Sequence, residues 1–180
     1  SSWGIPGQKR PSRTTSTELS IDGFDTVPES GSGNAVLTAD GFTLPGIADA
    51  ETGANGEFHT HTMKVRVPQD AVGDLVEIEA QVSLGAAGST LGRVTTTVKC
   101  IETDKSVSQI TSISADTSRT LKNLLSLTPL SGAGTAGNTL EITFERTPGD
   151  GTDTAIYAAL HVHSVALKTR RATNAHRSST

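Results

Sequence analysis

Short runs in which apolar and polar residues alternate fill most of the chain, a pattern typical of β-strands with one buried face. In residues 58–67, for example, Met63, Val65 and Val67 alternate with charged residues. The runs number eight: residues 35–44, 58–67, 75–84, 91–101, 107–113, 120–127, 139–146 and 155–167. Gly, Pro, Asp and Ser separate them, as turns between strands require.

A helical pattern has one candidate, residues 118–127, where Leu121, Leu124 and Leu125 fit a single helical turn. We interpret this segment as a strand and keep a helix there as the alternative. Eight antiparallel strands in one domain predict an all-β fold, a single eight-stranded antiparallel β-sandwich of the jelly-roll type.

The domain boundaries follow from composition. Residues 1–34 are rich in Gly, Pro, Ser and Thr and are expected to form an extended N-terminal arm. Residues 35–169 are expected to form the jelly-roll β-sandwich, and residues 170–180 a basic C-terminal tail. The length of 180 residues is typical of one domain.

Charge separates the ends from the body. Residues 1–17 and 168–180 carry basic side chains and no acid, whereas the residues between them hold all 19 acidic residues. We expect the basic ends to bind acidic patches on neighbouring protein subunits, with an apolar anchor at the N-terminus. The residues predicted to bind such a partner are Trp3, Ile5, Lys9, Arg10, Arg13, Arg170 and Arg171.

Composition argues against several other functions. No apolar run has the length of a membrane span, and no secretory signal pattern opens the sequence, so we expect synthesis in a cytoplasm and no membrane partner. Aromatic residues make up 3% of the chain, which disfavours stacking platforms for single-stranded nucleic acid or sugars. We expect no specific nucleic-acid partner, because the basic ends could make only nonspecific phosphate contacts and the acidic body would repel such a ligand. Cys100 is the only cysteine, so no intrachain disulfide forms.

A resemblance covers residues 119–169, where RTLKNLLSLTP is followed by a Gly/Ala loop and TLEITFERTPGDGTDTAIYAALHVHSVAL. A strand ending in Arg146, a Gly/Asp turn at residues 149–153, Thr154 before Tyr157, and a final apolar strand resemble the jelly-roll structural proteins of tailed bacteriophages. This resemblance implies a head-decoration (cement) protein, or a collar or tail component. Such proteins commonly form trimers and use terminal arms to hold the shell or a neighbour.

Two His-x-His pairs are the most distinctive chemical feature, because residues two apart in a strand face the same way. They could meet in a metal site, as in cupin-type enzymes, but the glutamate of that motif is missing after His61. His59 and His61 share parity with the apolar face, whereas His161 and His163 alternate with apolar residues and are expected to point away from the core. We therefore predict that the two pairs lie on different faces and hold no metal.

No catalytic residues were identified from the sequence, since no serine lies in a Gly-x-Ser-x-Gly elbow and Cys100 alternates with apolar strand residues. We accordingly expect no enzyme activity and no cofactor. The predicted function is a virion structural protein that decorates a capsid, acts as a homotrimer, and binds the major capsid protein or neighbouring virion subunits. The alternative is a receptor- or carbohydrate-binding jelly-roll module, as in a tail or fibre. A cupin-like metalloenzyme is a third, less favoured hypothesis.

Overall fold

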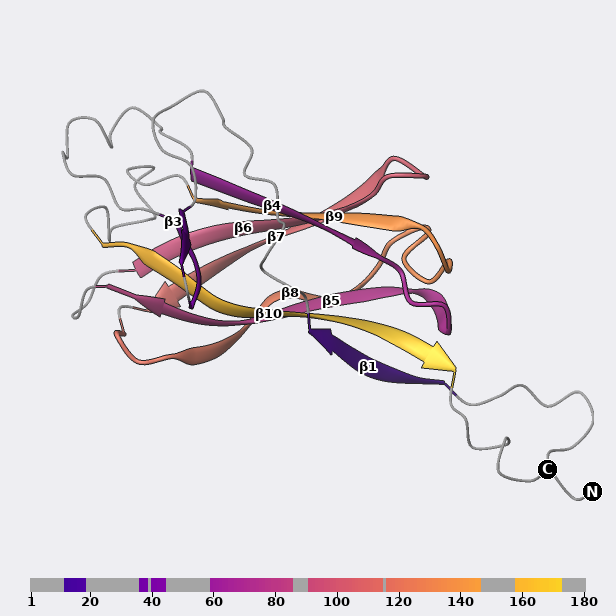
Figure 1. Cartoon of the computed structure of the whole chain (residues 1–180), viewed down its shortest axis with the longest axis horizontal. Coiled ribbons are helices and arrows are strands. Elements are labelled where there is room, and N and C mark those ends of the chain that lie inside the picture. The colour runs from indigo at the N-terminus through magenta and orange to yellow at the C-terminus, as the bar shows by residue number, and fades with distance from the viewer. Residues whose placement is uncertain are drawn as a thin grey trace, which may run out of the picture.

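The structure, a computed structural model, describes residues 12–18, 36–38, 40–44, 59–85, 91–114, 116–146 and 158–172. These residues form ten strands (Figure 1). In chain order they are β1 (Ser12–Glu18), β2 (Val36–Thr38), β3 (Gly41–Leu44), β4 (His59–Arg66), β5 (Ala71–Leu84), β6 (Leu91–Cys100), β7 (Lys105–Ser114), β8 (Thr120–Pro129), β9 (Thr139–Arg146) and β10 (Leu160–Ala172).

Two antiparallel sheets are stacked face to face (Figure 1). The six-stranded sheet has the order β2-β3-β10-β5-β8, and β1 also pairs with β10. The four-stranded sheet has the order β4-β9-β6-β7. Strand β10 is central, because it pairs with β5 on one side and with both β3 and β1 on the other.

The core lies between the sheets and follows the alternation in the sequence. In β9, every second residue is buried, which places Leu140, Ile142 and Phe144 in the core. The same alternation buries Val76 and Ile78 in β5. Burial of one face per strand is the main favourable term that holds the two layers together.

A buried arginine closes this core at one end. Arg146, the last residue of β9, has no exposed surface and donates hydrogen bonds to the carbonyl oxygens of Leu44 and Ala158. It thereby ties the four-stranded sheet to β3 and to the approach of β10. A buried guanidinium requires such acceptors, because leaving it unpaired costs several kcal/mol.

Strand β8 explains why residues 118–127 looked partly helical. Leu124 and Leu125 are adjacent in sequence, yet both are buried. This is possible because the register between β8 and β5 shifts near Ile78, where β8 is irregular. The strand interpretation is therefore confirmed, and the helical alternative is wrong.

The predicted fold class is confirmed: the protein is an all-β antiparallel sandwich of the jelly-roll type. Each of the eight predicted strand segments contains a strand, and residues 35–44 contain two, β2 and β3. Strand β1 lies within the expected arm, and the start of the expected tail continues β10. Among the described residues no helix has the length and apolar character needed to cross a membrane.

Candidate functional site

A pocket lies on the outer face of the six-stranded sheet, where β10, β5 and β8 run side by side. Its volume is about 490 Å³. It is lined by Glu79, Ala80, Gln81, Leu121, Ser164, Val165 and Ala166. We call it the outer-face pocket. Polar side chains surround a small apolar surface there. Leu121 is 61% exposed and lies next to Gln81, which pairs with Ser164 on its other side.

Glu79, the acidic residue that lines this pocket, is held by a partner. Lys168 Nζ lies 2.6 Å from Glu79 Oε1, and this hydrogen bond raises the pKa of Lys168. Two residues earlier in β5, on the same face but outside the pocket lining, Glu77 accepts a hydrogen bond of 2.7 Å from the side-chain amide of Asn123. The pocket and its border therefore present both hydrogen-bond donors and acceptors, and Lys168 largely balances the negative charge of Glu79.

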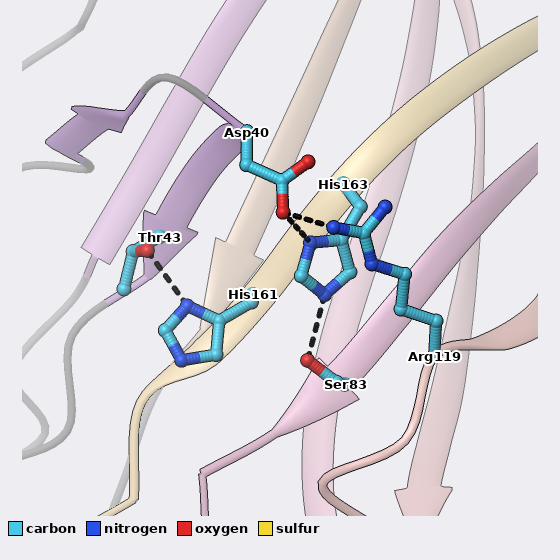
Figure 2. Close-up of polar contacts among 6 residues, drawn as sticks. All are labelled: Asp40, Thr43, Ser83, Arg119, His161 and His163. Atoms are coloured by element: carbon cyan, nitrogen blue, oxygen red, sulfur yellow. Dashed lines mark hydrogen bonds and ion pairs between the residues drawn. The ribbon is translucent and has the colours of Figure 1, made fainter.

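A second polar group lies next to the pocket and is defined here as the outer-face cluster: Asp40, Thr43, Ser83, Arg119, His161 and His163 (Figure 2). His163 Nε2 lies 2.7 Å from Ser83 Oγ, and its Nδ1 lies 3.2 Å from Asp40 Oδ2. The same carboxylate oxygen of Asp40 accepts a hydrogen bond from the Arg119 guanidinium. Ser83, His163, Asp40 and Arg119 thus form a continuous chain of hydrogen bonds from β5 through β10 to the turn before β3.

Two local features of the backbone bring these residues together. The register between β10 and β5 shifts between Val162 and Ser164, so His163 lies in a β-bulge, and bulges redirect side chains. Gly41 lies so close to β10 that a Cβ there would be 2.0 Å from the carbonyl oxygen of Val162. Its φ of +112° also suits glycine. Only glycine therefore lets the turn carry Asp40 to His163.

His161 completes the cluster from the neighbouring position on the same face. Its Nδ1 lies 2.9 Å from Thr43 Oγ1, and its ring centroid is 6.0 Å from that of His163. Burial lowers the pKa of His161, the nearby His163 lowers it further, and Asp40 acts in the opposite direction. The surroundings of His161 therefore disfavour its protonated form, and the hydroxyl of Thr43 fixes its ring.

The other His-x-His pair has a different environment. His61 is fully buried in the core and stacks on Phe42, with ring centroids 4.2 Å apart. Burial lowers the pKa of His61 to about 4. The opposite faces predicted from parity are confirmed for His61 and for the pair at 161 and 163; the side chain of His59 lies outside the described part. Within the described ranges, no three His, Cys, Asp or Glu side chains are grouped to hold a metal.

The residues predicted to bind a partner are only partly described. Trp3, Ile5, Lys9 and Arg10 lie outside the described residues. Arg13 is in β1, opposite Arg171 in the ladder with β10, and its side chain is also outside them. Arg171 Nε binds Asp70 Oδ1 of the same chain at 2.6 Å, whereas Arg170 is exposed. Their role toward a neighbouring subunit stays a prediction.

Sequence reasoning missed the hydrogen-bonded chain of Ser83, His163 and Asp40. Ser83 and His163 are 80 residues apart, and Asp40 and His163 are 123 residues apart. No local motif signals such a set, since only the order of β3, β10 and β5 in the sheet brings it together. The one signal available was the parity of His163, which placed it on the outer face.

Comparison with known proteins identifies the fold and little else. No model of a known protein family matches the chain, and no curated protein matches it in sequence. A solved xylan-binding module, CBM15, is similar with a TM-score of 0.55 and 13% identity, over 87% of this chain and 97% of that one. A mutant of Xylanase10C from Cellvibrio japonicus in complex with xylopentaose has a TM-score of 0.51 and 12% identity, over 85% of this chain and 28% of that one.

These similarities confirm the jelly-roll part of the resemblance found in the sequence. At such low identity they show the fold alone. The relation to bacteriophage proteins gains no support from them and stays a prediction.

Proposed function

We propose that the protein is a carbohydrate-binding module that binds a polysaccharide on the outer face of its six-stranded sheet. The observation that carries this proposal is the outer-face pocket of about 490 Å³, in a fold similar to a xylan-binding module. The sequence offered carbohydrate binding as the alternative hypothesis, and it now replaces capsid decoration as the favoured one.

The chemistry of the pocket suits a neutral sugar. Sugars present hydroxyl groups around an apolar ring face, so they need polar side chains beside an apolar surface. Gln81 and Ser164 supply hydrogen-bonding groups, and the exposed Leu121 supplies the apolar surface. The Glu79–Lys168 ion pair leaves little net charge for an acidic sugar to bind.

The affinity is expected to be low. The aromatic side chains in the described part, Phe42 and Phe144, are both buried in the core and cannot stack on a sugar. The described residues of the pocket then contribute mainly hydrogen bonds that replace bonds to water, each with a small net gain. We expect a dissociation constant on the order of 0.1 to 1 mM, which corresponds to about 4 to 6 kcal/mol.

Affinity electrophoresis tests the proposal. Migration of the protein through gels that contain neutral xylan should be slower than through gels without polysaccharide or with polygalacturonate. Gln81→Ala and Leu121→Ala should each restore most of the mobility, whereas Thr97→Ala, on the outer face of the four-stranded sheet, should not. Equal mobility in all gels, or equal retardation of the three variants, would contradict the proposed site.

Capsid decoration stays a second candidate, with a homotrimer, the major capsid protein as partner and the virion as location. The observation that favours it is the exposed Arg170 at the end of β10, beside the strand that carries Arg13. Native mass spectrometry of the full chain tests it. A trimer that dissociates with Arg170→Glu would favour it, and a monomer would count against it.

A further inference from the structure

The outer-face cluster contains the three groups of an acyl-transfer site in hydrogen-bonded order. Ser83 Oγ lies 2.7 Å from His163 Nε2, and His163 Nδ1 lies 3.2 Å from Asp40 Oδ2 (Figure 2). We propose that Ser83, His163 and Asp40 form a serine-nucleophile site that hydrolyses small acyl esters. This goes beyond carbohydrate binding, and for this one site it replaces the expectation that the protein is not an enzyme.

The partners of His163 set the tautomer of its neutral ring in the way that catalysis needs. A carboxylate can only accept hydrogen bonds, so Nδ1 of His163 donates to Asp40. In the neutral ring Nε2 then carries no hydrogen and accepts the hydroxyl hydrogen of Ser83. Ser83 is the nucleophile, His163 the general base, and Asp40 the group that orients the imidazole.

Neighbouring contacts support this geometry. Arg119 binds the same oxygen of Asp40 that faces His163, which favours this orientation of the carboxylate. The bulge in β10 directs His163 toward both partners, and Gly41 allows the turn with Asp40 to approach. Ser83 lies in β5 and has 6% of its surface exposed, while the side chain of His163 is 12% exposed. Both catalytic groups are therefore held by packing just below the surface.

The position of Ser83 limits the size of the substrate. A pocket of about 210 Å³ borders it, and its other lining residues are Val82, Ile113, Ser114, Asp116, Thr120 and Lys122. On the other side, Gln81 of the outer-face pocket is two residues away on the same face of β5. A short acyl group, such as acetyl, fits a space of this size. The arrangement therefore suits short O-acyl esters, including those carried by a sugar hydroxyl.

The proposed reaction needs water as its only co-reactant. Ser83 Oγ attacks the ester carbonyl carbon while its proton passes to His163 Nε2. The tetrahedral intermediate breaks its bond to the alcohol oxygen, which takes that proton and leaves, so an acyl-Ser83 ester remains. Water then attacks this ester, gives one proton to Nε2, and releases the carboxylic acid as Ser83 Oγ regains the proton. One ester and one water become one acid and one alcohol.

Slow turnover is expected, and the test is designed for it. Ser83 lies within a regular strand and not on the sharp strand-to-helix turn that exposes the serine and its oxyanion donors in α/β-hydrolases. With an activated ester, whose phenolate leaves readily, acylation of Ser83 should be faster than the following hydrolysis, and the acyl-enzyme should be visible as an added mass. Covalent labelling is accordingly a more sensitive readout than the rate of product release.

The experiment combines p-nitrophenyl acetate hydrolysis with mass spectrometry of the full chain after reaction with a fluorophosphonate probe. We expect hydrolysis above the buffer rate and labelling of Ser83, located by peptide mapping. Ser83→Ala should abolish the label and lower hydrolysis by roughly 10³-fold or to the buffer rate. The matched control is Ser108→Ala, which removes a hydroxyl bonded at 2.7 Å to Thr97 on the other sheet and should keep both activities.

Asp40 is a positioning residue and needs a different readout. Asp40→Asn keeps the size of the side chain but can donate to Nδ1, which favours the wrong tautomer of His163. We expect it to lower kcat by at least tenfold with little change in KM, and Asp40→Glu to recover part of the loss.

The proposal is overturned if the wild-type protein hydrolyses no ester above buffer and takes no label, or if Ser83→Ala behaves as wild type while circular dichroism shows both are folded. The hydrogen bonds would then be structural only. Gel retardation by xylan is measured separately on the same Ser83→Ala protein, so failure of the ester reaction leaves carbohydrate binding independently testable.

Discussion

The two His-x-His segments have the same local sequence pattern and opposite environments. His61 in β4 is enclosed in the core against Phe42, whereas His161 and His163 in β10 lie on the outer face among polar partners. The pattern of neighbours, and not the histidines themselves, sets this difference, because side chains in a strand alternate between faces. An imidazole in the core contributes packing, and one on the outer face is available for chemistry.

Replacing the core histidine should have the largest effect on stability. His61→Ala removes a fully buried ring and leaves a cavity beside Phe42, so we expect a loss of about 3 kcal/mol in the free energy of unfolding. The matched variant His161→Ala removes a half-buried ring and one hydrogen bond, and should cost about 1 kcal/mol or less. Urea unfolding at pH 8 measures both. Equal losses would show that the two environments are not as different as described.

Acid should weaken the fold through the same core histidine. The pKa of His61 is about 4 in the folded protein and about 6.5 in an unfolded chain, so above pH 6.5 neither state is protonated. As the pH falls from 6.5 to 4, the unfolded state binds a proton that the folded state does not, and stability falls by up to about 3 kcal/mol. Below pH 4 this loss is complete.

His61→Leu should remove this contribution to the pH dependence. The difference in unfolding free energy between wild type and variant, measured by urea titration from pH 7.5 to pH 4, isolates His61 from the other titrating groups. Parallel curves for the two proteins would contradict the lowered pKa.

Glycine at position 41 should matter to the outer-face cluster more than to the core. Gly41→Ala places a methyl group against the carbonyl of Val162 and forces the turn away from β10, with an expected loss of about 2 kcal/mol. Gly73→Ala is the matched control, since it also has a positive φ but nothing within 4 Å of the added Cβ, and should cost about 1 kcal/mol. Thermal unfolding compares them. A Gly41→Ala protein as stable as the control would mean that the close approach is absent.

The ion pair of the outer-face cluster should contribute least to stability. Arg119 and Asp40 are 53% and 56% exposed, and exposed pairs contribute about 0.5 kcal/mol or less. Arg119→Gln should therefore unfold at nearly the wild-type urea concentration. A loss above about 1.5 kcal/mol would show that the cluster serves mainly to stabilise the fold.

Local patterns in the sequence were sufficient for the fold class and insufficient for the site. Alternation within each strand places Ile142 and Phe144 inside and His163 outside without knowledge of the sheet order. The cluster depends on β3, β10 and β5 being neighbours, and that order is decided by packing between distant segments. The adjacent leucines of β8 show the other limit. A change in register with β5 buries both Leu124 and Leu125, and two consecutive apolar residues in the sequence resemble the pattern of a helical turn.

The proposed carbohydrate-binding site is tested by titrating the isotope-labelled protein with xylopentaose and following backbone amide shifts by two-dimensional NMR. We expect saturable shifts confined to residues around Gln81, Leu121 and Ser164, with a dissociation constant on the order of 0.1 to 1 mM. Shifts confined to the four-stranded sheet would contradict the account. So would a spectrum that is unchanged at about 10 mM xylopentaose, tenfold above the upper end of the expected dissociation constant.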